Sequence, residues 1–266
     1  MTAYPHLFSE WQIRNTTMKN RVVFPPTCPT WVSDPWNGLF TEQATKYYAE
    51  RANGGVGLII IGATHVHESS LMAPLLMPQL WDDRNIEPLS QIADAVHAAG
   101  CKLAIQLWHS GVRGFPVCKQ ETQFNLDATW YTLSPSQVPL GEFPGASTPK
   151  ELSNEEIEEI LDAYGAAARR AVAAGCDGVE FHLSHGYLPW QFLSPLYNKR
   201  TDKWGGSYET GSASRSRDSR RCARRSVTSR SSATASTRPR SGRAISNSTT
   251  SSGSWRIWRR RPTSTT

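Results

Sequence analysis

An almost wholly apolar run, VGLIIIGA at residues 56–63, sets the kind of sheet that this chain can build. A strand without alternating polar residues suits a sheet covered on both faces, and such sheets consist of parallel strands. Parallel neighbours are joined by crossover connections that usually contain a helix. The run therefore predicts that strands and helices alternate along the chain.

The sequence up to residue 209 shows this alternation. Further β-rich runs lie at 21–26, 102–109 and 177–182. Helical patterns lie between the strands, at 41–51, 86–99 and 153–174, and glycine follows each of them. Four strands with helices between them predict an α/β fold, for which a doubly wound sheet and a (β/α)8 barrel both fit. No G-x-G-x-x-G follows a strand, which counts against a dinucleotide-binding sheet.

Local signals mark where two of these helices begin. Thr41 is placed to cap the first helix, and Ser153 with Glu156 forms an S-x-x-E capping box at the start of the third. Between the third strand and this capping box, residues 111–152 lack a clear period and are predicted to be an irregular loop.

Polar residues gather at the predicted carboxyl ends of all four strands. They are Thr27 and Cys28, residues 63–67, Gln106, His109 and Arg113, and His182, His185 and Tyr187. In a barrel these ends form the active face, so one pocket would collect them. A single polar residue of this kind is ordinarily a satisfied buried group, but the repetition over four strands favours a site.

Three segments also resemble the Old Yellow Enzyme family of FMN-dependent oxidoreductases. They are NRVVFPPTC at 20–28, IQLWHSG at 105–111 and HLSHGYLPWQFLSPLYNKRTDKWGGSYE at 182–209. They occur in the family's order and spacing, and the resemblance covers residues 7–209. It implies that residues 1–209 are the N-terminal portion, about four βα units, of a (β/α)8 TIM barrel.

The resemblance also implies roles for individual residues. Pro26, Thr27 and Cys28 would lie along the FMN ring, with Ala63 and Gln106 also in contact with it. His182 and His185 would donate hydrogen bonds to the substrate's carbonyl oxygen, and Tyr187 would give a proton to the substrate carbon. The implied reaction is NAD(P)H-driven reduction of the activated C=C bond of an enone or related small electrophile, with FMN as cofactor.

Other classes of site find less support. The H-x-x-H at His182 and His185 has no further ligand at a suitable spacing, so no metal is expected. The five cysteines are scattered and form no C-x-x-C pair, which argues against a disulfide framework and against the iron–sulfur branch of the family. With no long apolar run and no signal-like N-terminus, we expect a soluble cytoplasmic protein that contacts no membrane and could oligomerise.

The composition changes abruptly after residue 209. Residues 1–209 hold 15 Lys and Arg against 22 Asp and Glu, whereas residues 210–266 hold 14 Arg and one acidic residue, Asp218. This last segment lacks Leu, Phe, Tyr and Met, so it is predicted to be a disordered tail. Its net charge of +13 leaves one alternative function open, that of a non-catalytic fragment binding nucleic acid non-specifically. Nothing in residues 1–209 indicates a specific nucleic-acid partner.

We interpret the tail as the product of a frameshift. Family members continue from G-G-S-x-E into N-R and a helix with leucine and phenylalanine. Deleting one A from GAA AAC CGG CTC CGC TTC CCG CTC GAG A, which encodes E-N-R-L-R-F-P-L-E, yields E-T-G-S-A-S-R-S-R, the sequence at 209–217. On this interpretation the second half of the barrel is missing, and the chain as printed is expected to bind FMN weakly or not at all and to be inactive.

Overall fold

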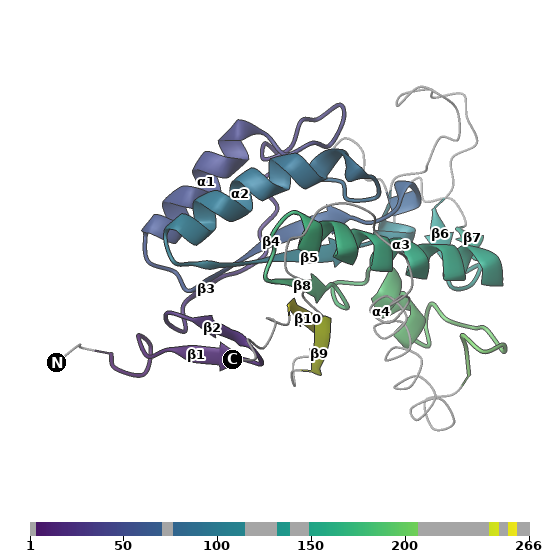
Figure 1. The fold of residues 1–266 in the computed structure, drawn as a ribbon. Helices are drawn as coiled ribbons and strands as arrows, with labels where there is room; N and C mark the ends of the chain where they lie inside the picture. Colours follow the sequence, from purple (N-terminus) through teal and green to yellow (C-terminus); the bar gives the residue numbers. More distant parts are fainter. Residues whose placement is uncertain are drawn as a thin grey trace, which may run out of the picture.

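The fold, taken from a computed structural model, is organised around parallel strands (Figure 1). The structure describes residues 4–70, 77–114, 132–138, 149–206, 245–249 and 255–259. Four parallel strands are neighbours in chain order: β3 (Val23–Phe24), β4 (Leu58–His65), β5 (Lys102–Trp108) and β8 (Gly178–Phe181). Three helices cover one face: α1 (Glu42–Asn53), α2 (Ile86–Ala98) and α3 (Asn154–Ala173). The prediction of four parallel strands with helices between them is confirmed.

The helices begin where the capping residues predict. The Thr41 side chain accepts a hydrogen bond from the Ala44 N–H at the start of α1. Ser153 and Glu156 form a complete capping box at the start of α3, each side chain accepting from the other residue's backbone N–H. Strand β3 is shorter than predicted because Pro25 and Pro26, which follow it, have no N–H for the ladder.

The two faces of the sheet carry different side chains. Ile59, Ile61 and Ile105 belong to the main core, together with residues of the three helices. Leu58, Ile60 and Ala104 alternate with them and form a second cluster with Met18. Met18 belongs to an N-terminal hairpin of β1 (Trp11–Ile13) and β2 (Thr16–Met18), which was not predicted and lies against the face opposite the helices.

Several short elements were also not predicted. Within the predicted loop lie the 3-10 turn η3 (Gly111–Arg113) and the paired strands β6 (Leu133–Ser134) and β7 (Lys150–Glu151). Elsewhere the chain forms η1 (Glu68–Ser70), η2 (Asp83–Asn85) and α4 (Leu188–Leu193). Such segments are too short for a periodic signal. In the described part of the chain, no helix has the length and apolar character needed to cross a bilayer.

Two segments of the predicted disordered tail form strands, which corrects the prediction at those residues. Strand β10 (Trp255–Arg259) pairs antiparallel with β8, and β9 (Ile245–Thr249) pairs with β10. The physical reason is that β8 ends the parallel sheet and offers unpaired backbone groups to any extended segment, while Trp and Ile favour a strand conformation. The rest of residues 210–266 lies outside the described residues, so disorder there stays a prediction.

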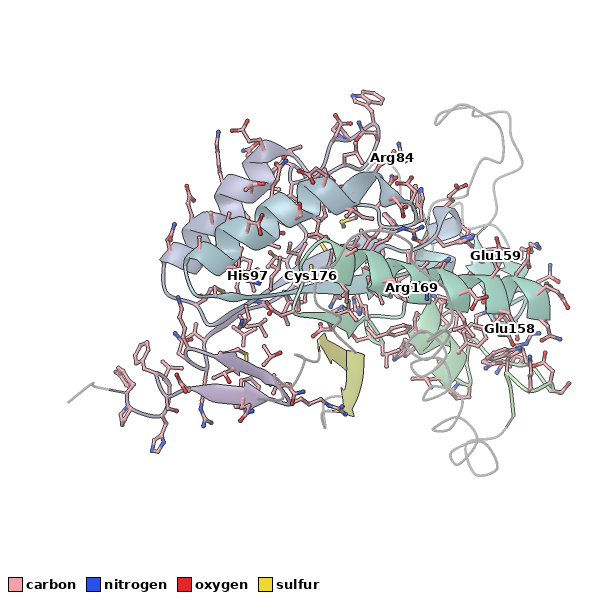
Figure 2. All side chains as sticks on the ribbon, viewed as in Figure 1. Arg84, His97, Glu158, Glu159, Arg169 and Cys176 are labelled. Carbon is pink, nitrogen blue, oxygen red and sulfur yellow. The ribbon has the colours of Figure 1, made fainter. Side chains whose placement is uncertain are left out.

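A buried carboxylate ties together the amino ends of the strands. Asp177 accepts a hydrogen bond from the Leu103 N–H at 3.0 Å, and His97 Nε2 lies 2.6 Å from its Oδ2. His97 belongs to the last turn of α2 (Figure 2). Lys102 Nζ lies 3.4 Å from the other oxygen. Burial raises the pKa of Asp177, but the contacts with His97, Leu103 and Lys102 together bring this pKa below its usual value.

Asp177→Asn is expected to lower the free energy of unfolding by about 1–3 kcal/mol at neutral pH, because it weakens charge-assisted hydrogen bonds at a buried position. A carboxyl group with a lowered folded-state pKa stabilises the fold above its unfolded-state pKa of about 4 and loses this effect as the pH falls further. Urea unfolding at pH 7 and pH 3 therefore should show a smaller difference between variant and unsubstituted chain at pH 3. If the free energies of unfolding of the variant and the unsubstituted chain differ by the same amount at both pH values, ionised Asp177 does not stabilise the fold.

Candidate functional site

The carboxyl ends of β3, β4, β5 and β8 bring the predicted site residues together. A Cβ built on Gly62 would lie 2.7 Å from the Cβ of Gln106 and 2.8 Å from that of Pro26, so these two side chains flank the Gly62 backbone. The Ala63 N–H donates to the Cys28 sulfur at 3.0 Å. Residues at the carboxyl ends of three successive strands thus lie beside one another.

Cys28 lies exposed on this surface, two residues beyond Pro26. Although the residue is exposed, desolvation of its sulfur raises the pKa of the thiol, and the hydrogen bond from Ala63 N–H acts in the opposite direction. The thiol is therefore neutral at neutral pH. Thr27 is also exposed, between these two residues.

His182, His185 and Tyr187 form a compact aromatic cluster directly after β8. His182 Nε2 lies 3.3 Å from His185 Nδ1. The Tyr187 ring lies 5.0 Å from the His182 ring and 6.4 Å from the His185 ring, centroid to centroid. Three groups able to donate a proton or a hydrogen bond thus lie together at the carboxyl end of β8.

The hydrogen bonds determine which nitrogen of His182 carries the proton. Burial, reinforced by the nearby His185, lowers the pKa of His182 to about 4, so its ring is neutral at neutral pH. The Ser184 N–H points at His182 Nδ1 at 3.4 Å, which makes Nδ1 the acceptor. The proton therefore sits on Nε2, which donates to His185 Nδ1. His185 in turn keeps its own N–H on Nε2, facing outward from the pair.

His185 adopts a backbone conformation that few side chains tolerate. Its φ is +60°, in the left-handed region, and Gly186 follows at +74°. A left-handed residue other than glycine costs roughly 1–2 kcal/mol, while Asn is among the few that tolerate it. The turn therefore holds an exposed imidazole over the site at a cost in stability.

His185→Asn is expected to leave the free energy of unfolding within about 0.5 kcal/mol of the unsubstituted chain, whereas His185→Val should lower it by about 1–2 kcal/mol, since a β-branched side chain suits left-handed backbone poorly. Because His185 is exposed, lost packing does not obscure the comparison. Urea unfolding of both variants measures it. Equal stability of the two variants would show that the conformation is not retained.

Tyr187 packs between the histidines and a buried tryptophan. Its ring lies 4.9 Å from that of Trp108 in an edge-to-face arrangement, and Ala63 belongs to the same apolar cluster. Burial, and then the nearby Cys28 thiol, raise the pKa of Tyr187, with Arg113 opposing them. The phenol is therefore protonated at neutral pH and able to serve as a proton donor.

Two histidines that the sequence places at the strand ends turn away from this surface. His109 is fully buried; its Nδ1 accepts the Gly111 N–H at 3.1 Å, and its Nε2 contacts Ser69 Oγ at 2.9 Å. His65 is also fully buried and contacts Ser70. Both therefore hold loops in place rather than face a ligand.

Three residues that the sequence did not single out support the site. Trp108 backs Tyr187. Glu180 accepts a hydrogen bond from Gln106 Nε2 at 2.8 Å. Gln191, fully buried, donates to the Gly186 carbonyl at 2.7 Å and accepts the Val112 N–H at 3.3 Å. The strand alternation places Glu180 on the face of Gln106 and His182, and that signal could have found it.

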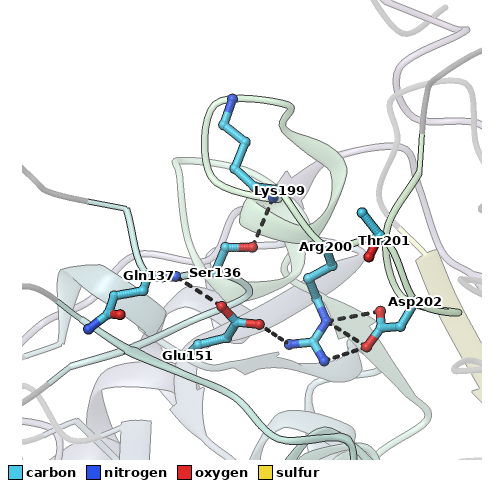
Figure 3. Close-up of a pocket in the computed structure, with 7 residues that line it drawn as sticks. All are labelled: Ser136, Gln137, Glu151, Lys199, Arg200, Thr201 and Asp202. Atoms are coloured by element: carbon cyan, nitrogen blue, oxygen red, sulfur yellow. Dashed lines mark hydrogen bonds and ion pairs between the residues drawn. The ribbon is translucent and has the colours of Figure 1, made fainter.

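Among the described residues, no group of three or more His, Cys, Asp and Glu is arranged to hold a metal ion. A hollow of about 300 Å³ is lined by Ser136, Gln137, Glu151 and Lys199 to Asp202, and none of the predicted site residues is among them (Figure 3). Arg200 dominates it, but its guanidinium already pairs with Asp202 and Glu151 and donates to the Pro135 and Leu152 carbonyls. In this hollow the Arg200 side chain therefore joins β6 and β7 to the loop that follows α4.

Comparison with known proteins decides the family. Residues 6–213 match the model of the NADH:flavin oxidoreductase / NADH oxidase family. This chain belongs to that family. It is 38% identical to an NADH oxidase of Thermoanaerobacter brockii over 79% of this chain and 30% of the relative, and 37% identical to an NADPH dehydrogenase of Bacillus velezensis over 76% and 55%. The chain thus spans about half the length of this dehydrogenase.

Two solved structures share the fold. An Old Yellow Enzyme homologue from Zymomonas mobilis superposes with a TM-score of 0.69 at 31% identity, over 84% of this chain and 60% of its own. Morphinone reductase in complex with tetrahydroNAD superposes with a TM-score of 0.68 at 31% identity, over 83% and 61%. The described sheet and helices are therefore part of a TIM barrel. Enzymes of this family use FMN with NADH or NADPH as reductant.

The family's strand-end residues in this chain fit the ring of FMN. A flavin ring has two apolar faces and one polar edge, and this surface offers the Pro26 and Ala63 side chains for a face and the Gln106 amide for the edge. Gly62 allows close approach of the neighbouring side chains, since any Cβ there would strike Gln106 and Pro26. These residues would hold the ring. The roles of individual residues, including Thr27 and Cys28, stay predictions.

Proposed function

We propose that this chain carries the ring-binding and proton-donating half of an NAD(P)H-dependent FMN enzyme that reduces the activated C=C bond of small enones. The observation that carries the proposal is the placement of His182, His185 and Tyr187 beside the surface formed by Pro26, Ala63 and Gln106. A reductant bound on that surface would face a substrate held at the histidines.

The side chains suit the charge changes of such a reduction. Bound FMN, once reduced by NAD(P)H, would supply a hydride to the β-carbon of the enone. Negative charge then grows on the carbonyl oxygen, where the outward N–H of His185 would donate a hydrogen bond. The neutral His182 would donate a second one when its Nε2 N–H turns from His185 Nδ1 to that oxygen. Tyr187, protonated at neutral pH, would give its proton to the α-carbon.

Only part of an FMN site is accounted for by these residues. Barrels of this kind commonly bind a cofactor phosphate with loops after their seventh and eighth strands, and the part of this chain that the structure describes supplies four parallel strands. We therefore propose that the chain as printed holds the flavin ring weakly, gains little from the FMN phosphate, and does not turn over enones. An incomplete parallel sheet also exposes strand edges, which favours aggregation.

The frameshift interpretation gives the sharpest test. The chain as printed and the product of a gene with one base inserted at the Glu209 codon are purified side by side. The second should contain about one FMN per chain and oxidise NADPH when 2-cyclohexenone is added; the first should do neither. Tight FMN retention by the printed chain would contradict the proposal. If neither protein binds flavin and the printed chain is retained on RNA in a salt-sensitive manner, the result would instead favour the alternative function, a basic fragment that binds nucleic acid.

A further inference from the structure

We propose that Glu180 is a positioning residue that makes Gln106 present its carbonyl oxygen, and not its NH2 group, to a bound ring. The inference rests on the proposed function, because it concerns how the flavin edge would be recognised. It identifies the ligand feature that this half-site selects: a ring imide N–H.

The sheet register places Glu180 beside Gln106. Gln106 on β5 and Glu180 on β8 are direct partners in the parallel ladder. The neighbouring residues Ile105, Leu107, Val179 and Phe181 all join the helix-side core, so Gln106 and Glu180 point to the opposite face. That face is the interior of the barrel to which this sheet belongs. His182, two residues beyond Glu180, follows the same alternation.

The contact between the two side chains leaves one orientation for the amide. Gln106 Nε2 and Glu180 Oε1 are 2.8 Å apart, and the two residues are only 7% and 6% exposed. A carboxylate offers acceptors alone, so the atom of Gln106 that faces it must be the NH2 group. Burial strengthens this preference, because an amide turned the other way would set two acceptors against each other without water between them.

The other end of the amide is aimed at the site. A Cβ built on Gly62 would lie 2.9 Å from Gln106 Oε1, so this oxygen sits against the end of β4, beside Pro26. An oxygen there accepts a hydrogen bond and cannot donate one. The polar edge of a flavin carries a single N–H, at N3 between two carbonyls. Glu180 thereby selects a ring with an imide donor, although it would not touch the ring itself.

Lumiflavin and 3-methyllumiflavin test this directly, since they lack the ribityl phosphate and differ only at N3. Their affinities for the purified chain are measured by quenching of flavin fluorescence. Methylation of N3 is expected to weaken binding to the unsubstituted chain by about tenfold, because Gln106 Oε1 loses its partner in a buried site. In Glu180→Gln the Gln106 amide can turn over, so the penalty should fall to about twofold.

Two further variants separate positioning from structure. Glu87→Gln, the same change at an exposed site on α2, should keep the full N3-methyl penalty. Gln106→Leu, which removes the oxygen while Glu180 remains, should lose the penalty even if Glu180→Gln does not fold. A merely structural Glu180 would weaken both ligands equally and leave their ratio unchanged. That result, or a retained penalty in Gln106→Leu, would overturn the inference but not the proposed function, whereas absence of lumiflavin binding to the unsubstituted chain would overturn both.

Discussion

Tyr187→Phe is expected to reduce the rate of 2-cyclohexenone reduction by about 10²–10⁴-fold in the frame-restored enzyme, because a positioned general acid contributes a factor of this size. The phenol lies in the cluster with His182 and His185, and burial keeps it protonated by raising its pKa. Loss of one oxygen leaves the ring packing on Trp108 in place. Product formation is followed by gas chromatography under anaerobic conditions.

The reductive half of the reaction provides the internal comparison. Reduction of the flavin by NADPH requires no proton from Tyr187, so its stopped-flow rate in Tyr187→Phe should match that of the unsubstituted enzyme within about twofold. Tyr4→Phe, at an exposed site near the N-terminus, controls for the loss of a phenol and should change neither rate. Undiminished enone reduction by Tyr187→Phe would remove this residue from the mechanism.

Gly111→Ala is expected to lower the free energy of unfolding of this chain by about 3 kcal/mol. Gly111 has a φ of +61°, which costs a side chain roughly 1 kcal/mol. Its new Cβ would also lie 2.4 Å from Gln191 Oε1. Gln191 is fully buried and joins Val112 to Gly186, so moving it breaks hydrogen bonds worth about 1 kcal/mol each.

Gly100→Ala is the matched control for backbone conformation. Its φ of +66° is nearly that of Gly111, but the nearest atom to a new Cβ is Lys19 Cδ at 3.9 Å. Gly100→Ala should therefore cost only the conformational term, about 1 kcal/mol. Urea unfolding of both variants measures the difference. If the two substitutions lower the free energy of unfolding equally, the hydrogen bonds of Gln191 do not hold together the loops that carry Gly111 and His185.

The sequence predicted the regular part of the fold because its signals are local. The apolar run at 56–63, the caps at Thr41 and Ser153, and the glycines after each helix act within a few residues of the chain. The N-terminal hairpin escaped prediction because its strands are three residues each and are held by the packing of Met18 on the sheet, a contact distant in sequence.

The site was predictable to the extent that strand ends could be located. Gln106 lies near the carboxyl end of β5, and His182 and Tyr187 lie together directly after β8. His109 also follows a strand, but whether a side chain faces the site or the loops depends on partners such as Ser69, 40 residues away. Glu180 was passed over because a single carboxylate inside a strand gives no sign of its partner on the neighbouring strand.

One measurement tests the central claim, that this chain carries the ring-binding half of an FMN site. FMN and lumiflavin are titrated separately against the purified chain as printed, and flavin fluorescence gives the two dissociation constants. We expect both ligands to bind, with constants within about threefold of each other, and FMN to be lost on gel filtration, because the residues of the proposed site would contact the ring and not the phosphate. FMN that stays bound at one per chain, or lumiflavin that does not bind at all, would contradict the account.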